Sequence, residues 1–197
     1  MHYHLFWPFI LFFMTTIKPI AQLGNPVLRA IASVIHDICT QTELMQALTD
    51  TLASTEGVGI AAPQISESKR VIIVASRPNT RYPHAPQMPP TLMFNPEFEP
   101  LGKARQIAFE GCLSVPSLRA QVPRYTKILA QYLDEQGIAQ QVILTDFVAR
   151  IFQHEVDHLN GIVYLDRVES SRAIISESEY FKRLGAGHWT VPQRLFA

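Results

Sequence analysis

Two histidines four residues apart, His154 and His158, are the side chains whose spacing most directly indicates chemistry in this chain. In an α-helix, residues four apart project from the same face, about 6 Å apart, so both imidazoles can reach one metal ion. Glu155 follows the first histidine and points to a neighbouring sector, where it can take a proton from metal-bound water rather than bind the ion. The spacing predicts a hydrolytic metal site, although two ordinary helix histidines would give the same pattern.

The residues around this pattern favour one amphipathic helix. Thr145 or Asp146 can cap its start, and Asn160-Gly161 supplies a C-terminal stop. Its apolar anchors are Phe147, Ile151 and Leu159. We therefore expect both histidines to be held by a helix that is fixed at its two ends.

A catalytic metal site of this kind needs a third protein ligand. Cys112 lies upstream, in a Gly-marked strand end that can turn a side chain toward a cleft, although a free cysteine is usually a small buried hydrophobe. The downstream candidates are Glu169, Glu177, Glu179 and His188. A downstream glutamate such as Glu177 or Glu179 would give a metallopeptidase of the ordinary His-Glu-x-x-His kind, and spacing alone leaves that alternative open. Both glutamates stand in a Ser-Glu-Ser-Glu run that is more typical of a solvated helix face.

Composition limits the class of protein. The 197 residues are enough for one domain with a real core and too few for two comfortable ones. Seventeen basic and seventeen acidic side chains give zero formal charge, so we expect no nucleic-acid binding. The two cysteines, Cys39 and Cys112, form no disulfide framework and favour a reducing compartment.

Residues 1–13 form an apolar block unlike the rest of the chain. The block is shorter than the roughly 20 apolar residues that cross a bilayer, and Pro8 interrupts it. It also lacks a basic residue before the apolar run and a cleavage pattern after it, as a secretory signal would have. We expect no membrane association, a natural start at Met14, and a single catalytic domain over residues 14–197. N-terminal sequencing of the native protein would test that start.

The elements that must position the candidate residues follow from the hydrophobic periodicity. A short helix is expected after Asn25-Pro26, a longer one from Thr40 or Thr42 to Leu52, and a last one over residues 170–184. The expected strands cover residues 70–76, 91–95, 104–110, 118–123, 127–133 and 139–144. Residues 78–90 carry five prolines and predict an exposed loop. Strands in the middle and helices at both ends predict an α+β domain, with antiparallel β-sheets wrapped around the central histidine helix.

Three segments together carry a resemblance to a known family. They are Gly57-Val-Gly-Ile-Ala-Ala-Pro-Gln64, Glu110-Gly-Cys-Leu-Ser114 and Gln153-His-Glu-Val-Asp-His158. In this order they resemble the signatures of the peptide deformylase family, and the likeness extends from about Ile17 to about Leu184. The resemblance implies hydrolysis of the formyl group on the initiator methionine of a new polypeptide, with release of formate.

The resemblance also implies the ligand set. Cys112, His154 and His158 would bind one metal ion and leave one position open for water. A thiolate and two imidazoles suit Fe²⁺, Zn²⁺, Ni²⁺ or Co²⁺ and disfavour Mg²⁺ and Ca²⁺. The family implies Fe²⁺ in the cell.

Further roles follow from the same resemblance. Glu155 would move the proton, while the side-chain amide of Gln64 and the backbone N–H of Leu113 would stabilise the developing oxyanion. Gly57 and Gly59 would let their segment pair with the peptide main chain as an added strand. Arg119 would lie near the path of the peptide. The methionine pocket would be lined by Val58, Phe147, Ile151 and the ring of His154.

Four charged residues stand in or beside these motifs. Glu110 and Arg124 are expected to form a buried pair behind Cys112, and Asp157 to fix the histidine helix, with ordinary surface pairing as the alternative. Arg150 stands where other members can carry an aliphatic residue, so its role at the pocket rim stays open.

The expected partners are N-formylmethionyl nascent peptides and the ribosome that makes them. Some bacterial members dock on the ribosome through a basic C-terminal helix, but here Lys182 and Arg183 precede a break, which argues against that route. The bacterial cytoplasm is the expected compartment. Because Phe147-Val-Ala-Arg150 is similar to the organellar branch, an organelle matrix is the alternative. A non-catalytic relative would need a broken catalytic position, and every motif position is intact.

Overall fold

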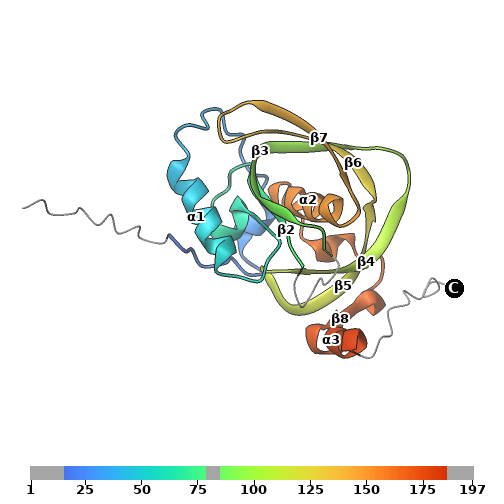
Figure 1. Ribbon diagram of the computed structural model, residues 1–197. Coiled ribbons are helices and arrows are strands. Elements are labelled where there is room, and N and C mark those ends of the chain that lie inside the picture. Colours follow the sequence, from blue (N-terminus) through green and yellow to red (C-terminus); the bar gives the residue numbers. More distant parts are fainter. Residues whose placement is uncertain (1–15, 79–84, 186–197) are drawn as a thin grey trace, which may run out of the picture.

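The histidine pattern lies on α2 (Asp146–Leu159), which occupies the centre of the computed structural model with strands on several sides (Figure 1). The structure describes residues 16–78 and 85–185. One antiparallel sheet has five strands in the order β1-β2-β3-β6-β7, and a second has three in the order β4-β5-β8. With α1 near the start and α3 near the end of the described chain, the predicted α+β class and the antiparallel sheets around the central helix are confirmed.

The bounds of the elements are as follows. The larger sheet contains β1 (Gly59–Ala61), β2 (Val71–Ser76), β3 (Met88–Pro100), β6 (Lys127–Leu133) and β7 (Ala139–Thr145). The smaller sheet contains β4 (Arg105–Cys112), β5 (Val115–Tyr125) and β8 (Ile174–Ser176). The other helices are α1 (Thr42–Ala53) and α3 (Glu177–Gly185), with short 3-10 turns at Pro26–Arg29, Ala62–Ile65, Tyr164–Arg167 and Ser171–Ala173.

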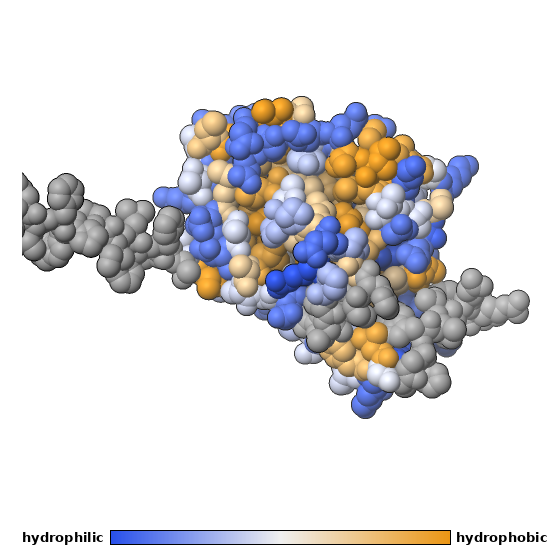
Figure 2. Space-filling view, viewed as in Figure 1, coloured by the Kyte–Doolittle hydropathy of each residue, from blue (hydrophilic) through white to orange (hydrophobic). Residues whose placement is uncertain are grey.

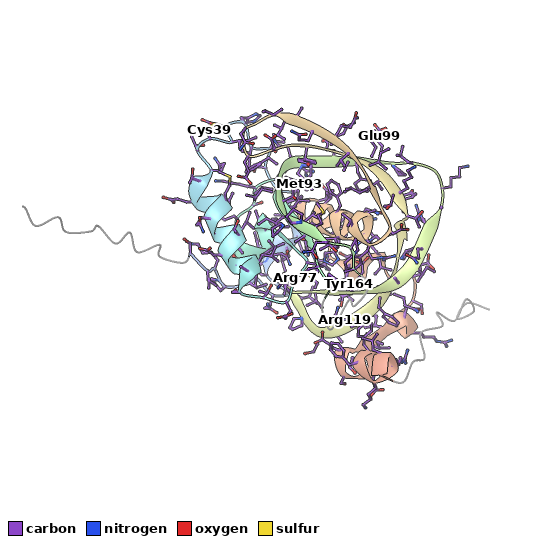
Figure 3. The ribbon with its side chains drawn as sticks, viewed as in Figure 1. Cys39, Arg77, Met93, Glu99, Arg119 and Tyr164 are labelled. Carbon is purple, nitrogen blue, oxygen red and sulfur yellow. The ribbon has the colours of Figure 1, made fainter. Side chains whose placement is uncertain are left out.

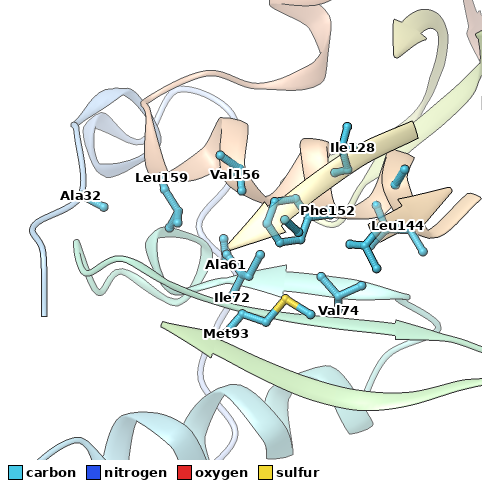
Figure 4. Packing of buried hydrophobic residues seen from close by; sticks show 13 residues of the cluster. Ala32, Ala61, Ile72, Val74, Met93, Ile128, Leu144, Phe152, Val156 and Leu159 are labelled. Carbon is cyan, nitrogen blue, oxygen red and sulfur yellow. The ribbon is translucent and has the colours of Figure 1, made fainter. Parts of the chain in front are cut away.

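The larger sheet is covered by a helix on each face. Along β2, Ile72 and Val74 point to one side and pack with Phe152 of α2 (Figure 4), whereas Ile73 points to the other side and packs with Leu48 of α1. All five side chains are at most 1% exposed. The period-two alternation of a strand therefore places α1 and α2 on opposite faces.

The histidine helix ends where its sequence indicates. Thr145 is the N-cap residue, without a side-chain cap hydrogen bond, and Asn160 is the C-cap residue. Gly161 has a positive φ of 71°, and a β-carbon there would lie 2.6 Å from the carbonyl oxygen of Arg29. Only glycine fits that turn without strain, so the predicted stop is confirmed.

Two stretches differ from the sequence prediction. The proline-rich stretch was expected to be loop as far as Pro90, but β3 already begins at Met88, which pairs with Ser76 beyond a register shift. Such an irregularity tolerates prolines, which cannot donate to the ladder. The expected continuous helix over residues 170–184 is instead a 3-10 turn, then β8, then α3, because residues 174–176 pair with β5. Residues 79–84 of the predicted loop lie outside the described residues.

The face seen in Figure 2 carries both polar and apolar groups. The most exposed large hydrophobic side chains, Ile31 and Ile138, lie in separate loops. Within the described residues, no helix is both long enough and apolar enough to cross a membrane. The apolar block at residues 1–13 lies outside the described residues.

Candidate metal centre

Three candidate ligands from two elements meet beside α2. Cys112 ends β4, where the β4–β5 register shifts between Glu110 and Cys112, while His154 and His158 project from α2. One ligand atom from each residue lies within 4.8 Å of the others, and Cys112 Sγ is 3.2 Å from His158 Nε2. A soft thiolate with two imidazoles suits a first-row transition metal, and three protein ligands leave a position for water.

The remaining candidate ligands lie elsewhere. Glu177 forms an ion pair with Arg119, and Glu179 is exposed and pairs with Lys182. Glu169 is exposed. His188 lies outside the described residues. Among the described residues, none of these downstream glutamates belongs to the group of ligand atoms around His154.

The charges around this group favour the thiolate form of Cys112. Burial alone would raise the pKa of the Cys112 thiol, but the neighbouring His158 and His154 rings hold that pKa well below its usual range. Burial would lower the pKa of His154, whereas hydrogen bonds with Cys112 and Glu110 raise it well above the ordinary value. The thiolate, the form of cysteine that ligates metals, is thus stabilised by positive charge around it.

Glu155 lines the same cavity as Cys112 and His154. The side chain is 4% exposed, and its Oε2 atom has no hydrogen-bond partner among the described residues. Burial raises the pKa of Glu155 to about 7, although the nearby His154 and His158 oppose that rise. A β-carbon at Gly59 would lie 2.5 Å from Glu155 Oε1, so only glycine lets the carboxylate lie against β1. A buried carboxylate with a pKa near neutrality is suited to accept and return a proton.

Gln64 directs its side-chain amide nitrogen toward the cysteine. Its Oε1 atom accepts a hydrogen bond from the Ala61 N–H at 2.8 Å, which fixes the amide. Its Nε2 atom donates to Ser114 Oγ at 3.2 Å and contacts Cys112 Sγ at 3.4 Å. With 2% exposure, this donor is held in place beside the ligands.

Glu110 anchors the first histidine from behind. Its Oε2 atom lies 2.9 Å from His154 Nδ1, and Arg124 donates to both carboxylate oxygens at 3.0 Å. Burial would raise the pKa of Glu110, but Arg124 and His154 hold it well below its usual range. Because a carboxylate can only accept, His154 Nδ1 donates to it, and the neutral form of this ring would offer the Nε2 lone pair to a metal once the Nε2 proton is lost.

Arg150 belongs to the same buried network. It stands one helical turn before His154 on α2 and donates from Nη1 to Glu110 Oε1 and to the Val122 carbonyl, both at 2.8 Å. The side chain also bonds the Gln106 carbonyl. Arg150 also lines the cavity, and its hydrogen bonds to Glu110 and to two backbone carbonyls give it the role that the sequence left open. The four-residue spacing from His154 is the sequence signal that could have indicated it.

Asp157 ties the other end of this network to α2. Arg124 donates to its Oδ2 atom at 2.5 Å, and Arg167 donates to its Oδ1 atom at 2.7 Å. The side chains of Glu110, Arg124 and Asp157 are at most 7% exposed, so surface pairing, the alternative for these residues, is wrong.

The comparisons with known proteins agree with this geometry. A model of the polypeptide deformylase family matches residues 17–173. The chain belongs to the polypeptide deformylase family. Peptide deformylase 2 of Nostoc sp. is 52% identical over 166 residues, which are 82% of this chain and 92% of that protein. Peptide deformylase 2 of Ralstonia nicotianae is 40% identical over 174 residues, 87% of this chain and 98% of that protein.

Solved deformylase structures share the fold. The Met-Ala-Ser-bound class I type b peptide deformylase of Acinetobacter baumannii has a TM-score of 0.76 and 44% identity, and the match covers 79% of this chain and 100% of that one. Family membership makes the chain a metal-dependent hydrolase with deformylase activity on new polypeptides, as its motifs indicate. The family match and the position of Cys112 beside the histidines argue against the alternative, an ordinary His-Glu-x-x-His peptidase with Glu177 or Glu179 as ligand.

A cavity of about 240 Å³ opens onto the candidate metal ligands Cys112 and His154. Its lining includes every expected site residue except His158, which is fully buried beneath it. The expected residues along the wall are Gly57, Val58, Gly59, Gln64, Cys112, Leu113, Arg119, Phe147, Ile151, His154 and Glu155. Gly59 starts β1, an edge strand of the larger sheet that pairs only with β2 among the described strands. A backbone edge, an apolar wall and the candidate ligands thus meet in one space.

Proposed function

We propose that Cys112, His154 and His158 hold one divalent metal ion, Fe²⁺ in the cell, and that Glu155 is the proton carrier of deformylation. The observation that carries this proposal is the buried Glu155 Oε2 atom, which has no partner among the described residues and belongs to a carboxylate lining the same cavity as Cys112 and His154. A divalent metal at this position lowers the pKa of water, which makes hydroxide available near neutral pH. Zn²⁺, Ni²⁺ and Co²⁺ fit the same donors.

Glu155 would act twice in one turnover. It accepts the proton of the attacking water as oxygen bonds to the formyl carbon, and it then delivers that proton to the departing amine nitrogen. The bond between the formyl carbon and the nitrogen breaks, which releases formate and a free amino terminus. Burial raises the pKa of Glu155, which makes its carboxylate a stronger proton acceptor than an exposed one.

Gln64 and Leu113 would stabilise the charge that develops on the formyl oxygen. The Gln64 amide is held by the Ala61 N–H and points toward Cys112, and the Leu113 backbone follows the cysteine directly. Removal of one such donor commonly costs about 3 kcal/mol of transition-state stabilisation.

The substrate would be the formylated methionine of a new polypeptide. Val58, Phe147 and Ile151 supply an apolar wall for the methionine side chain. The edge strand β1, which begins at Gly59, and the segment just before it with Gly57 can pair with the peptide main chain. The Met-Ala-Ser complex of the Acinetobacter baumannii relative supports a peptide of this kind.

The setting of the reaction is part of the same proposal. We place the enzyme in the bacterial cytoplasm, supported by its bacterial relatives, with an organelle matrix as the alternative. Residues 14–197 would form one catalytic domain that meets nascent chains at the ribosome. Detection of the chain in washed ribosome fractions would test that partner.

The decisive experiment is anaerobic purification with Fe²⁺ followed by measurement of formate released from formyl-Met-Ala-Ser. The parent protein should turn over, and Glu155→Ala should lose about 10²-fold to 10⁴-fold in kcat while retaining stoichiometric metal. Substitution of Zn²⁺ for Fe²⁺ in the same preparation tests the identity of the metal.

Glu179→Gln is the matched control, because this glutamate is exposed and pairs with Lys182 away from the cavity. It should keep the parent rate and the parent metal content. If the parent, loaded with stoichiometric metal, releases no more formate than Glu155→Ala, the proposed function is wrong.

A further inference from the structure

The C-terminal part of the described chain reaches the cavity through β8. Strand β8 pairs with β5 so that Ile175 lies opposite Arg119, and α3 begins immediately afterwards at Glu177. Figures 1 and 3 show α3 beside β5, with Arg119 on the side that faces the helix. This register brings the first carboxylate of α3 to the strand that carries Arg119.

Arg119 is held in a fixed position. Its side chain is 4% exposed, and its guanidinium lies over Gly111, where an added β-carbon would be 2.2 Å from Nη1. The guanidinium carbon is also 5.3 Å from the ring centre of Tyr180, on the first turns of α3. The missing side chain at Gly111 and the ring of Tyr180 together define the space that the cation occupies.

Glu177 is the anionic partner of this cation. Arg119 Nη2 donates to Glu177 Oε1 at 2.5 Å, and the Glu177 side chain is 27% exposed. Both residues line the cavity that holds the candidate ligands. The pair therefore lies on the substrate side, where a charged peptide group would meet either a neutralised arginine or a bare one.

The position of the pair relates it to the residues that follow the methionine. Val58, Phe147 and Ile151 supply the apolar lining proposed for the methionine, and the formyl group would lie at Cys112 and His154. The peptide residues after the methionine would then lie along the part of the wall that contains Arg119 and Glu177. A bare guanidinium there would favour acidic side chains, which an enzyme acting on many amino-terminal sequences should not do.

We propose that Glu177 is a specificity-determining residue, which neutralises Arg119 and so prevents selection for acidic residues at the second and third positions of the peptide. The inference rests on the proposed function. Glu177 does not take part in the hydrolysis, so its removal changes which peptides are preferred more than it changes the chemical step.

The test compares Glu177→Gln with the parent on C-terminally amidated peptides formyl-Met-X-Ala and formyl-Met-Ala-X, where X is Asp, Ser or Lys. In the parent, kcat/KM should be similar for Asp and Lys. In Glu177→Gln the Asp-to-Lys ratio should rise about fivefold, mainly through KM, the size expected for one partly exposed charge. The gain should shrink as KCl is raised. Glu179→Gln removes a charge from the same helix away from the cavity and should leave the ratio unchanged.

The double variant Arg119→Gln/Glu177→Gln completes a double-mutant cycle, which tests whether the effect of Glu177 depends on Arg119. The gain for acidic peptides should vanish in it, because the cation that attracts them is gone. An unchanged ratio in Glu177→Gln, an equal shift in Glu179→Gln, or a gain that persists without Arg119 would each overturn the proposal.

Two measurements keep the outcome unambiguous. Metal content and thermal unfolding show whether each variant is folded. If Glu177→Gln is not folded, Arg119→Gln alone should shift the ratio the other way, toward Lys, because it removes the cation and keeps the Glu177 carboxylate in the cavity wall; no shift would overturn the proposal. Failure of the parent on the Ser peptides would instead contradict the deformylase function itself.

Discussion

The two faces of α2 are both buried, yet different forces hold them. One face, with Phe152 and Val156, packs into the hydrophobic core under the larger sheet. The other, with Arg150, His154 and Asp157, meets β4 and β5 through hydrogen bonds and ion pairs. An amphipathic pattern here does not mark a solvent-exposed face, because the second sheet covers the polar side.

This difference sets how each face responds to change. Apolar contacts are non-directional, so a core can adjust to a side chain of similar volume. On the polar face each donor has a specific acceptor, and removal of one partner leaves another charge buried and unpaired. The polar face should therefore be the less tolerant of the two, and it carries the candidate site.

Glu110→Gln should show the largest effect of this kind. It removes the charge that Arg124, Arg150 and His154 share, and loss of one partner from a buried ion pair typically costs about 3–5 kcal/mol. Metal affinity should fall about 10-fold to 100-fold, since His154 loses the anion that orients its ring. Urea denaturation of the metal-free protein and a competitive chelator titration measure the two effects. Unchanged stability together with unchanged metal affinity would mean that the network has no structural role.

Phe152→Leu should have a smaller effect on the opposite face. Phe152 is fully buried and meets the Phe98 ring edge to face with 6.1 Å between centroids. The shorter side chain should cost about 1–2 kcal/mol in unfolding free energy, because part of the space is refilled. Metal affinity and kcat should stay at parent values in the folded fraction. A loss of metal affinity as large as that of Glu110→Gln would contradict the separation of the two faces.

Much of the apolar face could be read from the sequence. The bounds of α2, its Gly161 stop and most strands depend on local periodicity and turn chemistry, which a single sequence displays. Strand β8 could not be read in this way. Its three residues form a strand only because β5 lies beside them, and pairing across more than fifty residues leaves no local pattern.

The polar face was only partly readable. The spacing of His154 and His158 indicated a shared ion, and the three motifs indicated Cys112, Gln64 and the glycines now found around one cavity. The contacts of Arg150 with Glu110 were not predicted, because an arginine on a helix is ordinarily solvated and its buried acceptors come from β4 and β5. The pairing of Glu177 with Arg119 was not predicted either, because it joins α3 to β5 across 58 residues of sequence.

Arg167→Gln should have the smallest effect on stability. It compares a buried and an exposed arginine that pair with the same carboxylate, Asp157. Asp157 receives Arg124, whose side chain is 5% exposed, and Arg167, whose side chain is 45% exposed. Water can replace the exposed guanidinium but not the buried one, so Arg167→Gln should cost about 1 kcal/mol or less, whereas Arg124→Gln should cost several times more. The urea midpoints of the two variants measure the difference, and raised salt should reduce the effect of Arg167 alone. Equal losses of unfolding free energy in the two variants would mean that burial does not decide the strength of these ion pairs. The polar face of α2 would then be held by hydrogen-bond geometry rather than by exclusion of water.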